Sequence, residues 1–368
     1  MVFHGCSSQC ENWMNHKVFL AESEDGKTFS LVKGWEPFAG SVPAVYRRGN
    51  TIFIYTGDSS VRKIDMNSGQ VQFAGKVALN ADSASDKTGF VDPTIEQGND
   101  GRFVMFYLPG AGAGKEPAGC NGESSCTKEI RYAVEEPGSG GMRFQYKGIA
   151  VTKNLTGTGT LSDPDIFNDG SKWVLLVSEG PSVEAFTSST LEGKYSSAGV
   201  ISSNSGGIPA GFHDGQSGSN WIYTTKENSS GQFIRRSVSK NGTDLLSSFE
   251  TVIDASIYKT ENLTTIASPS FRRNNSGAPC PTCSPTGQSS TSPSPSAASS
   301  SPEPTPSATP LVPVNSPSPS PSPIVSSAKP QPSPSVTKKI ISITCIKGKV
   351  KKVVTGTNPV CPSGYKKV

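Results

Sequence analysis

Short hydrophobic runs alternate with turn residues along the first three quarters of the chain, and almost no stretch has the 3.6-residue spacing of an amphipathic helix. Runs such as Thr51–Tyr55, Arg102–Leu108 and Trp173–Val177 are rich in β-branched and aromatic residues. Gly, Asn and Asp separate successive runs about every ten residues, as in domains built from many short strands. The pattern predicts an all-β domain, which leaves a sandwich, a barrel or a propeller.

Internal repetition favours the propeller. Four times an x-Pro dipeptide opens one strand and three short strands follow it. The opening strands are expected at Ser41–Tyr46, Val91–Ile95, Ser162–Ile166 and Gly207–Phe212. The fourth strands of the same sets are expected at Val71–Phe73, Met142–Tyr146, Lys194–Ser196 and Leu245–Phe249. Units of this kind stack side by side because none can bury both faces alone.

The two ends of this region complete a fifth set. Ala267–Phe271 is a first strand with nothing usable after it, whereas Met1–Gly5, His16–Glu22 and Thr28–Val32 look like strands two, three and four. Pairing the two ends would close the ring and protect its edges. We therefore predict a five-bladed β-propeller over residues 1–275, closed by its N-terminal strands.

Composition changes sharply after the propeller. Residues 276–336 are mostly Ser, Pro, Thr and Ala, which cannot bury a core and predict a disordered, extended linker. Residues 337–368 contain eight lysines and no acidic residue, a charge of +8 against +4 for the whole chain. This tail is either a cationic module that holds anionic cell-wall polymer or a membrane surface, or a merely solubilising end. It is similar to short Lys-rich tails with two cysteines on secreted bacterial proteins.

The eight cysteines fall into close pairs with none left over. The pairs are Cys6/Cys10, Cys120/Cys126, Cys280/Cys283 and Cys345/Cys361. Such pairs predict small disulfide loops formed in an oxidising compartment, with free thiols in a cytosolic protein as the alternative. A zinc site at Cys280/Cys283 is disfavoured because no second pair lies nearby.

We expect an extracellular or cell-surface location, because the cysteine pairs and the Ser/Pro linker are typical of exported proteins. The opening residues have neither the basic start nor the apolar stretch of a signal peptide. Either the start is internal to a longer reading frame or the export signal was lost. No run of about 18 apolar residues is present, so no transmembrane segment is predicted.

A five-bladed ring whose inner strands open on x-Pro, often Asp-Pro, resembles the furanosidase superfamily of arabinanases, levansucrases and invertases, glycoside hydrolase families 43, 32 and 68. The resemblance covers residues 1–275 and rests on the repetition of a short motif. It implies three carboxylates at the mouth of the tunnel, one from each of the first three blades. They act as base or nucleophile, as an Asp that adjusts pKa or binds sugar, and as acid. Glycoside cleavage needs one protonated and one ionised carboxyl on opposite sides of the anomeric carbon.

This chain keeps part of that set. Asp92 precedes Pro93 in the second blade, and Asp163 stands in the third blade where the family usually has Glu. In the first blade Val42 stands where the family has its Asp, and valine can neither activate water nor attack carbon. Two alternatives can supply the missing base. Either Asp163 itself is the base, or the base comes from the end of a second strand.

The second-strand ends carry Asp58, Glu179, Glu227 and His4. Our candidate catalytic residues are Asp92, Asp163 and Glu179. Our candidate substrate-binding residues are Asp58, Asp165 and Glu227. We predict no metal ligands and no cofactor, with a central ion left open. The simpler structural reading is that Asp-Pro makes a turn by bonding a nearby backbone N–H.

Other chemistries fit the sequence poorly. Residues 109–116 imitate a phosphate-binding loop, but no Ser or Thr follows Lys115 and Pro117 opposes a helix. No Gly-x-Ser-x-Gly motif occurs, and three histidines give little material for a Ser-His-Asp triad. Basic residues of the propeller are scattered and its net charge is negative, so nucleic acid is not expected as a partner.

Two functions remain. The first is a glycoside hydrolase that acts on furanose- or xylose-containing polysaccharide or oligosaccharide with paired carboxylates. The second is a non-catalytic carbohydrate-binding or adhesion propeller that keeps the pocket without the chemistry. The carboxylates Asp92 and Asp163 favour the first, and Val42 favours the second.

Overall fold

The chain forms two compact units, Met1–Gln288 and Ser289–Val368, in a computed structural model. The structure describes residues 1–80, 89–110, 118–229, 231–255, 262–272, 341–347, 350–356, 361 and 364–367. The expected linker at 276–336 and the pair Cys280/Cys283 lie outside the described residues, so the predicted domain boundaries stay a prediction. No helix in these described segments is long and apolar enough to cross a membrane.

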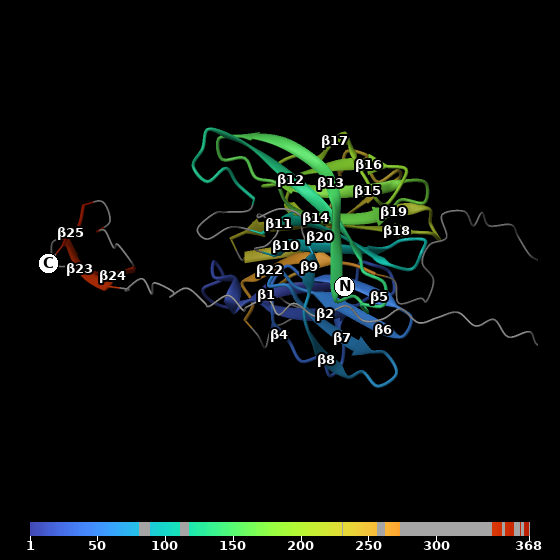
Figure 1. Ribbon diagram of the computed structural model, residues 1–368, viewed down its shortest axis with the longest axis horizontal. Coiled ribbons are helices and arrows are strands. Elements are labelled where there is room, and N and C mark those ends of the chain that lie inside the picture. Colours follow the sequence, from blue (N-terminus) through green and yellow to red (C-terminus); the bar gives the residue numbers. More distant parts are fainter. Residues whose placement is uncertain are drawn as a thin grey trace, which may run out of the picture. The chain divides into compact units, whose positions relative to one another are not determined.

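The first unit is a five-bladed β-propeller (Figure 1). In blades one to four, four antiparallel strands run in chain order from the centre outward. The strands are β5 (Ala44–Arg48), β6 (Thr51–Tyr55), β7 (Ser60–Asp65) and β8 (Val71–Lys76) in blade one; β10 (Phe90–Gln97), β11 (Phe103–Pro109), β12 (Ser125–Glu135) and β13 (Arg143–Thr156) in blade two; β14 (Ser162–Asn168), β15 (Trp173–Glu179), β16 (Ser182–Ser188) and β17 (Ser196–Ser202) in blade three; and β18 (Gly207–Asp214), β19 (Ser219–Asn228), β20 (Gly231–Ser239) and β21 (Glu250–Ile253) in blade four. In Figure 1 inner strands such as β10 and β14 lie centrally, and the outermost strands β8 and β17 lie at opposite edges.

Blade five joins the two ends of the propeller, as predicted. Its order is β22 (Thr265–Ser270), β1 (Val2–Cys6), β2 (Lys17–Glu22) and β3 (Ser30–Leu31), and β4 (Phe38–Ala39) also pairs with β2. The closing pair is antiparallel, with Val2 opposite Ser270 and Cys6 opposite Thr265. A short 3-10 helix, Trp13–Asn15, lies between β1 and β2, and β9 (Ala78–Asn80) adds to the outer edge of β13.

Two outer strands were placed wrongly by the sequence. The fourth strand of blade three is Ser196–Ser202 rather than Lys194–Ser196, and that of blade four is Glu250–Ile253 rather than Leu245–Phe249. In both cases the prediction was drawn to a buried apolar residue of the preceding loop, Tyr195 or Leu246. The true strands are largely exposed, so they carry little hydrophobic signal.

The core is divided among the contacts between blades. Five hydrophobic clusters occur in the part of the propeller that the structure describes, and each joins two neighbouring blades. The cluster between blades two and three is the largest and contains Phe106 and Leu175. The cluster between blades five and one has only five buried members, including Val18 and Ile64. The junction between blades five and one therefore has the fewest buried apolar residues.

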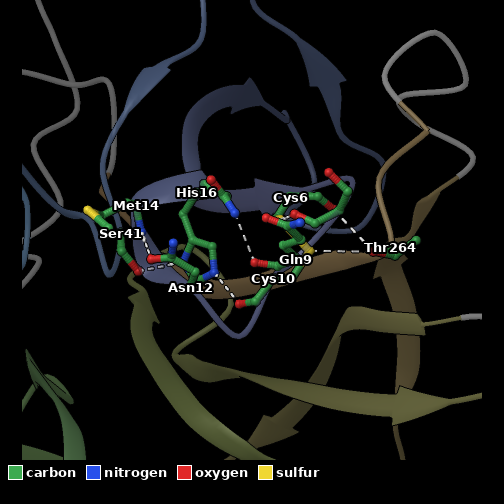
Figure 2. Close-up of a disulfide and its surroundings, with 10 residues drawn as sticks. Cys6, Gln9, Cys10, Asn12, Met14, His16, Ser41 and Thr264 are labelled. Atoms are coloured by element: carbon green, nitrogen blue, oxygen red, sulfur yellow. Dashed lines mark hydrogen bonds between the residues drawn. A yellow bond between two sulfur atoms is a disulfide. The ribbon is translucent and has the colours of Figure 1, made fainter. Parts of the chain in front are cut away.

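The predicted disulfides Cys6–Cys10, Cys120–Cys126 and Cys345–Cys361 are confirmed. Figure 2 shows how the first one supports ring closure. Thr264, just before β22, donates its backbone N–H to the Cys6 carbonyl at 2.8 Å. The His16 ring contacts the Cys10 carbonyl at 2.8 Å and the Ser41 hydroxyl at 2.7 Å. The disulfide loop thus links β22 and β2 to the start of blade one.

The inner strands need further partners because each has one edge that no strand of its own blade covers. Side chains of the preceding blade supply some of them. Thr94 Oγ1 accepts from Ile166 N at 3.3 Å, Asp165 Oδ2 from Gly211 N at 2.8 Å, and Ser270 Oγ from Val45 N at 3.0 Å. The three acceptors hold the same position, directly after the proline of their own inner strand.

Replacing Thr94 by Val should lower the free energy of unfolding by about 1–3 kcal/mol. The substitution keeps the side-chain shape but leaves Ile166 N–H without its acceptor and Asp165 Oδ1 without the donor at 3.2 Å. Urea unfolding measures the change. Thr94→Ser keeps the hydroxyl and should lose less, and Thr152→Ala at an exposed position is the neutral control. Equal stability of the Val and Ser variants would contradict this role.

Candidate active site at the tunnel mouth

An unusual backbone conformation places five side chains around one cavity. In every blade the residue before the inner-strand proline has a positive φ of about 50°. These residues are Val42, Asp92, Asp163, Ile208 and Ser268, with φ between 47° and 53°. In blades two to five the ladder skips a residue at this point, as in a β-bulge. The repeated bulge is the device that turns one residue per blade toward the tunnel.

The bulge carries a cost. Positive φ is rare for residues other than glycine, and for β-branched residues such as Val42 and Ile208 it is a genuine outlier. Strain of this kind costs about 1–3 kcal/mol per residue and persists only where surrounding packing enforces it. Asp92 and Asp163 tolerate the conformation better, because Asp is among the residues enriched there.

The cavity at the mouth is small in the described part of the propeller. It holds about 20 Å³, room for about one water molecule. Its wall is made by the five residues with positive φ, the prolines that follow them, Asp165 and Ser270. The sequence did not single out Ile208 or Ser268, although the x-Pro repeat that marks Asp92 also marks them. The Ser268 hydroxyl is buried and has no hydrogen-bond partner in the described structure.

Asp92 and Asp163 form a coupled pair. The Asp163 backbone N–H donates to Asp92 Oδ2 at 3.3 Å, so the two residues meet across the junction of blades two and three. Burial raises the pKa of Asp92 well above its usual range, and the negative charge of Asp163 raises it further. Burial also raises the pKa of Asp163, to about 6, against a hydrogen bond from Ser162 that lowers it. Two close carboxyls cannot both ionise easily, so near neutral pH the pair retains one proton.

Asp165 lies two residues deeper and serves a different purpose. It is 4% exposed, and it binds Thr94 of one neighbouring blade and Gly211 of the other. Burial raises its pKa to about 7, although Arg272 and these two donors lower it. Its contacts fasten blade three between blades two and four.

Position 42 offers no acid. The Val42 N–H donates to His4 Nδ1 at 3.3 Å, and the His4 ring stacks on His16 at 4.3 Å. Burial lowers the pKa of His4 to about 3, and the charge of His16 contributes to the lowering. His4 is therefore neutral at physiological pH and holds the Val42 backbone.

Three other candidates lie away from this cavity. Asp58 Oδ2 accepts a hydrogen bond from Lys76 Nζ at 2.8 Å. Burial raises the pKa of Asp58, but the hydrogen bonds that Lys76, Thr56 and Ser60 donate to its carboxylate outweigh burial and lower this pKa to about 2. Glu179 forms an ion pair with Lys153, which also binds Glu184. Glu227 is exposed in the hairpin between β19 and β20. None of the three lines the cavity, and their predicted roles stay predictions.

A larger cavity of about 670 Å³ opens where the inner strands end, beside Phe271 and Arg272. The cavity extends along the junction between blades five and one, where Leu20 and Ile64 form part of its wall. Four carboxylates lie on its wall, those of Glu22, Glu24, Asp25 and Asp214. Two of them, Asp25 and Asp214, accept hydrogen bonds from the backbone of their own turns. This cavity is larger than the one at the mouth, and Asp92 and Asp163 do not line it.

Comparisons with known proteins give structural matches alone. No protein-family model matches the chain, and no curated protein matches it. Among solved structures, an arabinanase from Cellvibrio cellulosa complexed with arabinohexaose has 14% identity and a TM-score of 0.41, covering 56% of this chain and 72% of its own. An exo-1,5-arabinanase from a bovine ruminal metagenomic library has 14% identity and a TM-score of 0.45, covering 64% and 84%. A family 43 endo-arabinanase from Bacillus licheniformis has 16% identity and a TM-score of 0.41, covering 58% and 77%. These values are too low to assign an activity.

The Asp163→Asn variant should gain stability relative to the native chain as pH rises from about 4 to about 7. The folded pKa of Asp163 lies above its unfolded value, so its folded form favours the bound proton, and stability is lost as pH rises through about 6. Removing the charge removes that loss, about 1–3 kcal/mol for a shift of this size.

Thermal unfolding of both proteins across this pH range measures the difference. Comparing variants is necessary because His4, whose pKa is lowered, makes a contribution of opposite sign. Glu123→Gln, at an exposed position, is the matched control. A stability difference between Asp163→Asn and the native chain that stays constant with pH would refute the buried, coupled pair.

Proposed function

We propose that the propeller binds extracellular glycans of the furanoside or xyloside type at its tunnel mouth, where one sugar hydroxyl enters the small cavity and Asp92 and Asp163 are the polar contacts. The observation that carries the proposal is the coupled pair, set on equivalent positions of adjacent blades around one cavity. A protonated carboxyl donates a hydrogen bond and an ionised one accepts, which matches sugar hydroxyls that do both. Three disulfides support an oxidising, extracellular setting.

Hydrolysis is the second candidate, and the split between the two pKa values favours it. Asp92 would be the proton donor and Asp163 the base, since the pKa of Asp92 is raised the more strongly. In the first blade Val42 supplies no carboxyl, so the set of acids that the hydrolase reading needs is incomplete. For this reason we place binding first.

Asp92→Asn and Asp163→Asn should each weaken glycan binding by about tenfold or more, because each removes one charge-assisted or carboxyl hydrogen bond to the sugar. Calorimetric titration of the full chain with arabino-, xylo- and fructo-oligosaccharides gives the affinities. Asp100→Asn should bind like the native chain. Unchanged affinity in both mouth variants would move the site elsewhere, with the 670 Å³ cavity as the next place to test.

Val42→Asp should increase release of reducing sugar from the same oligosaccharides by at least about tenfold over the native chain. It puts a third carboxyl among the residues that precede the inner-strand prolines, and acid or base groups in place contribute about 10²–10⁴ in rate. Asp also tolerates the positive φ of position 42 better than Val. Val42→Asn has the same shape without the acid and should stay inactive. If the native chain already releases sugar and both Asp→Asn variants abolish it, hydrolysis replaces binding as the function.

A further inference from the structure

The second unit is a small three-stranded sheet that presents lysines. Its order is β24 (Val350–Gly356), β23 (Ile341–Lys347) and β25 (Lys366–Lys367), all antiparallel, and the disulfide Cys345–Cys361 stabilises it. Lys347, Lys351, Lys366 and Lys367 are exposed.

The strand register sets the positions of two of these lysines. Ile346 on the central strand lies opposite Lys351 on one side and Lys366 on the other. Directly opposed residues point to the same face of a sheet, so both lysines flank Ile346 on one face. Two strand spacings separate them, about 10 Å.

The opposite face is partly covered. Cys345, the neighbour of Ile346, is fully buried and carries the disulfide to Cys361. Because side chains alternate between faces, the disulfide lies on the face away from Ile346. The face with Ile346, Lys351 and Lys366 is thus the one the disulfide leaves open.

No carboxylate side chain balances this charge within the tail. Residues 337–368 contain eight lysines and neither Asp nor Glu. At physiological salt the Debye length is about 8 Å, so lysines about 10 Å apart still repel weakly and both attract an anion placed between them. The chemistry of the face is that of a site for repeated negative charges.

The residue types narrow the class of anion. Lysine is a hydrated point charge that attracts phosphate without fixed geometry, unlike arginine. Tyr365 is the one aromatic residue in 337–368, too few for the stacking platforms that bind single-stranded nucleic acid. The open face has no Trp, Phe or Leu to enter a membrane interface.

We propose that the C-terminal unit is a polyanion-binding module that attaches the chain to a phosphodiester-linked cell-wall polymer. The lysines on either side of Ile346 bind successive phosphates of the polymer. The module acts independently of the glycan site of the propeller.

The test measures binding of the full chain to bacterial cell walls that carry phosphodiester polymer, and to the same walls after hydrofluoric acid has removed it. The native chain should bind the first and lose at least about tenfold in affinity for the second, because the acid removes the phosphates that the lysines contact. The double variant Lys351→Gln/Lys366→Gln should lose about tenfold on intact walls, and the slope of log Kd against log salt should fall by about one to two. Lys17→Gln/Lys194→Gln, at exposed positions of the propeller, is the matched control and should bind normally.

The double variant should bind the oligosaccharides of the proposed glycan site like the native chain, which separates this module from that site. Non-reducing mass analysis of the double variant checks that Cys345–Cys361 still forms. Equal binding to stripped walls, or an unaffected double variant, would overturn the proposal. Tighter binding to a single-stranded oligonucleotide or to phosphatidylglycerol vesicles than to intact walls would also overturn it, in favour of that ligand.

Discussion

The uncovered edge of each inner strand is the constraint on which the propeller depends. A blade buries its faces against neighbouring blades, but the inner strand still presents N–H groups to the tunnel. Thr94, Asp165 and Ser270 satisfy three of these groups in the next blade round the ring. The same position holds Ala44 and Ala210 in the other two blades, and alanine has no side-chain acceptor. At three junctions of the ring the inner strands are therefore tied to each other by side chains as well as by apolar packing.

The site follows from the same geometry. In blades two to five the inner-strand pairing is interrupted at the proline by a bulge, and the residue before the proline turns into the tunnel. Burial there raises the pKa of whatever acid the position holds, so Asp92 and Asp163 become coupled without any special partner. With Val42, Ile208 and Ser268 in the remaining places, the ring has acids on one side and none on the other.

The junction between blades five and one has the smallest hydrophobic cluster and lies beside the β-strand pairing that closes the ring. The cluster between blades five and one is small, and the 670 Å³ cavity opens beside it. The pairing of β1 with β22, the disulfide Cys6–Cys10 and the His16 contacts all act near this join. Covalent and polar contacts thus compensate for apolar surface that the join does not bury.

The sequence alone determined the class of fold, the number of blades, the closure by the N-terminal strands and the disulfide pairs, because each depends on local periodicity, repetition or spacing. It also located Asp92 and Asp163, since the x-Pro repeat marks one position per blade. Tertiary structure decided the rest. In the sequence, Asp58, Glu179 and Glu227 carry the same carboxyl chemistry as Asp92. In the fold, Asp58 pairs with Lys76, Glu179 pairs with Lys153, and Glu227 is exposed on a hairpin. Only the packed ring shows which carboxyls lose water and meet each other, because burial and coupling depend on residues that are far apart in the chain.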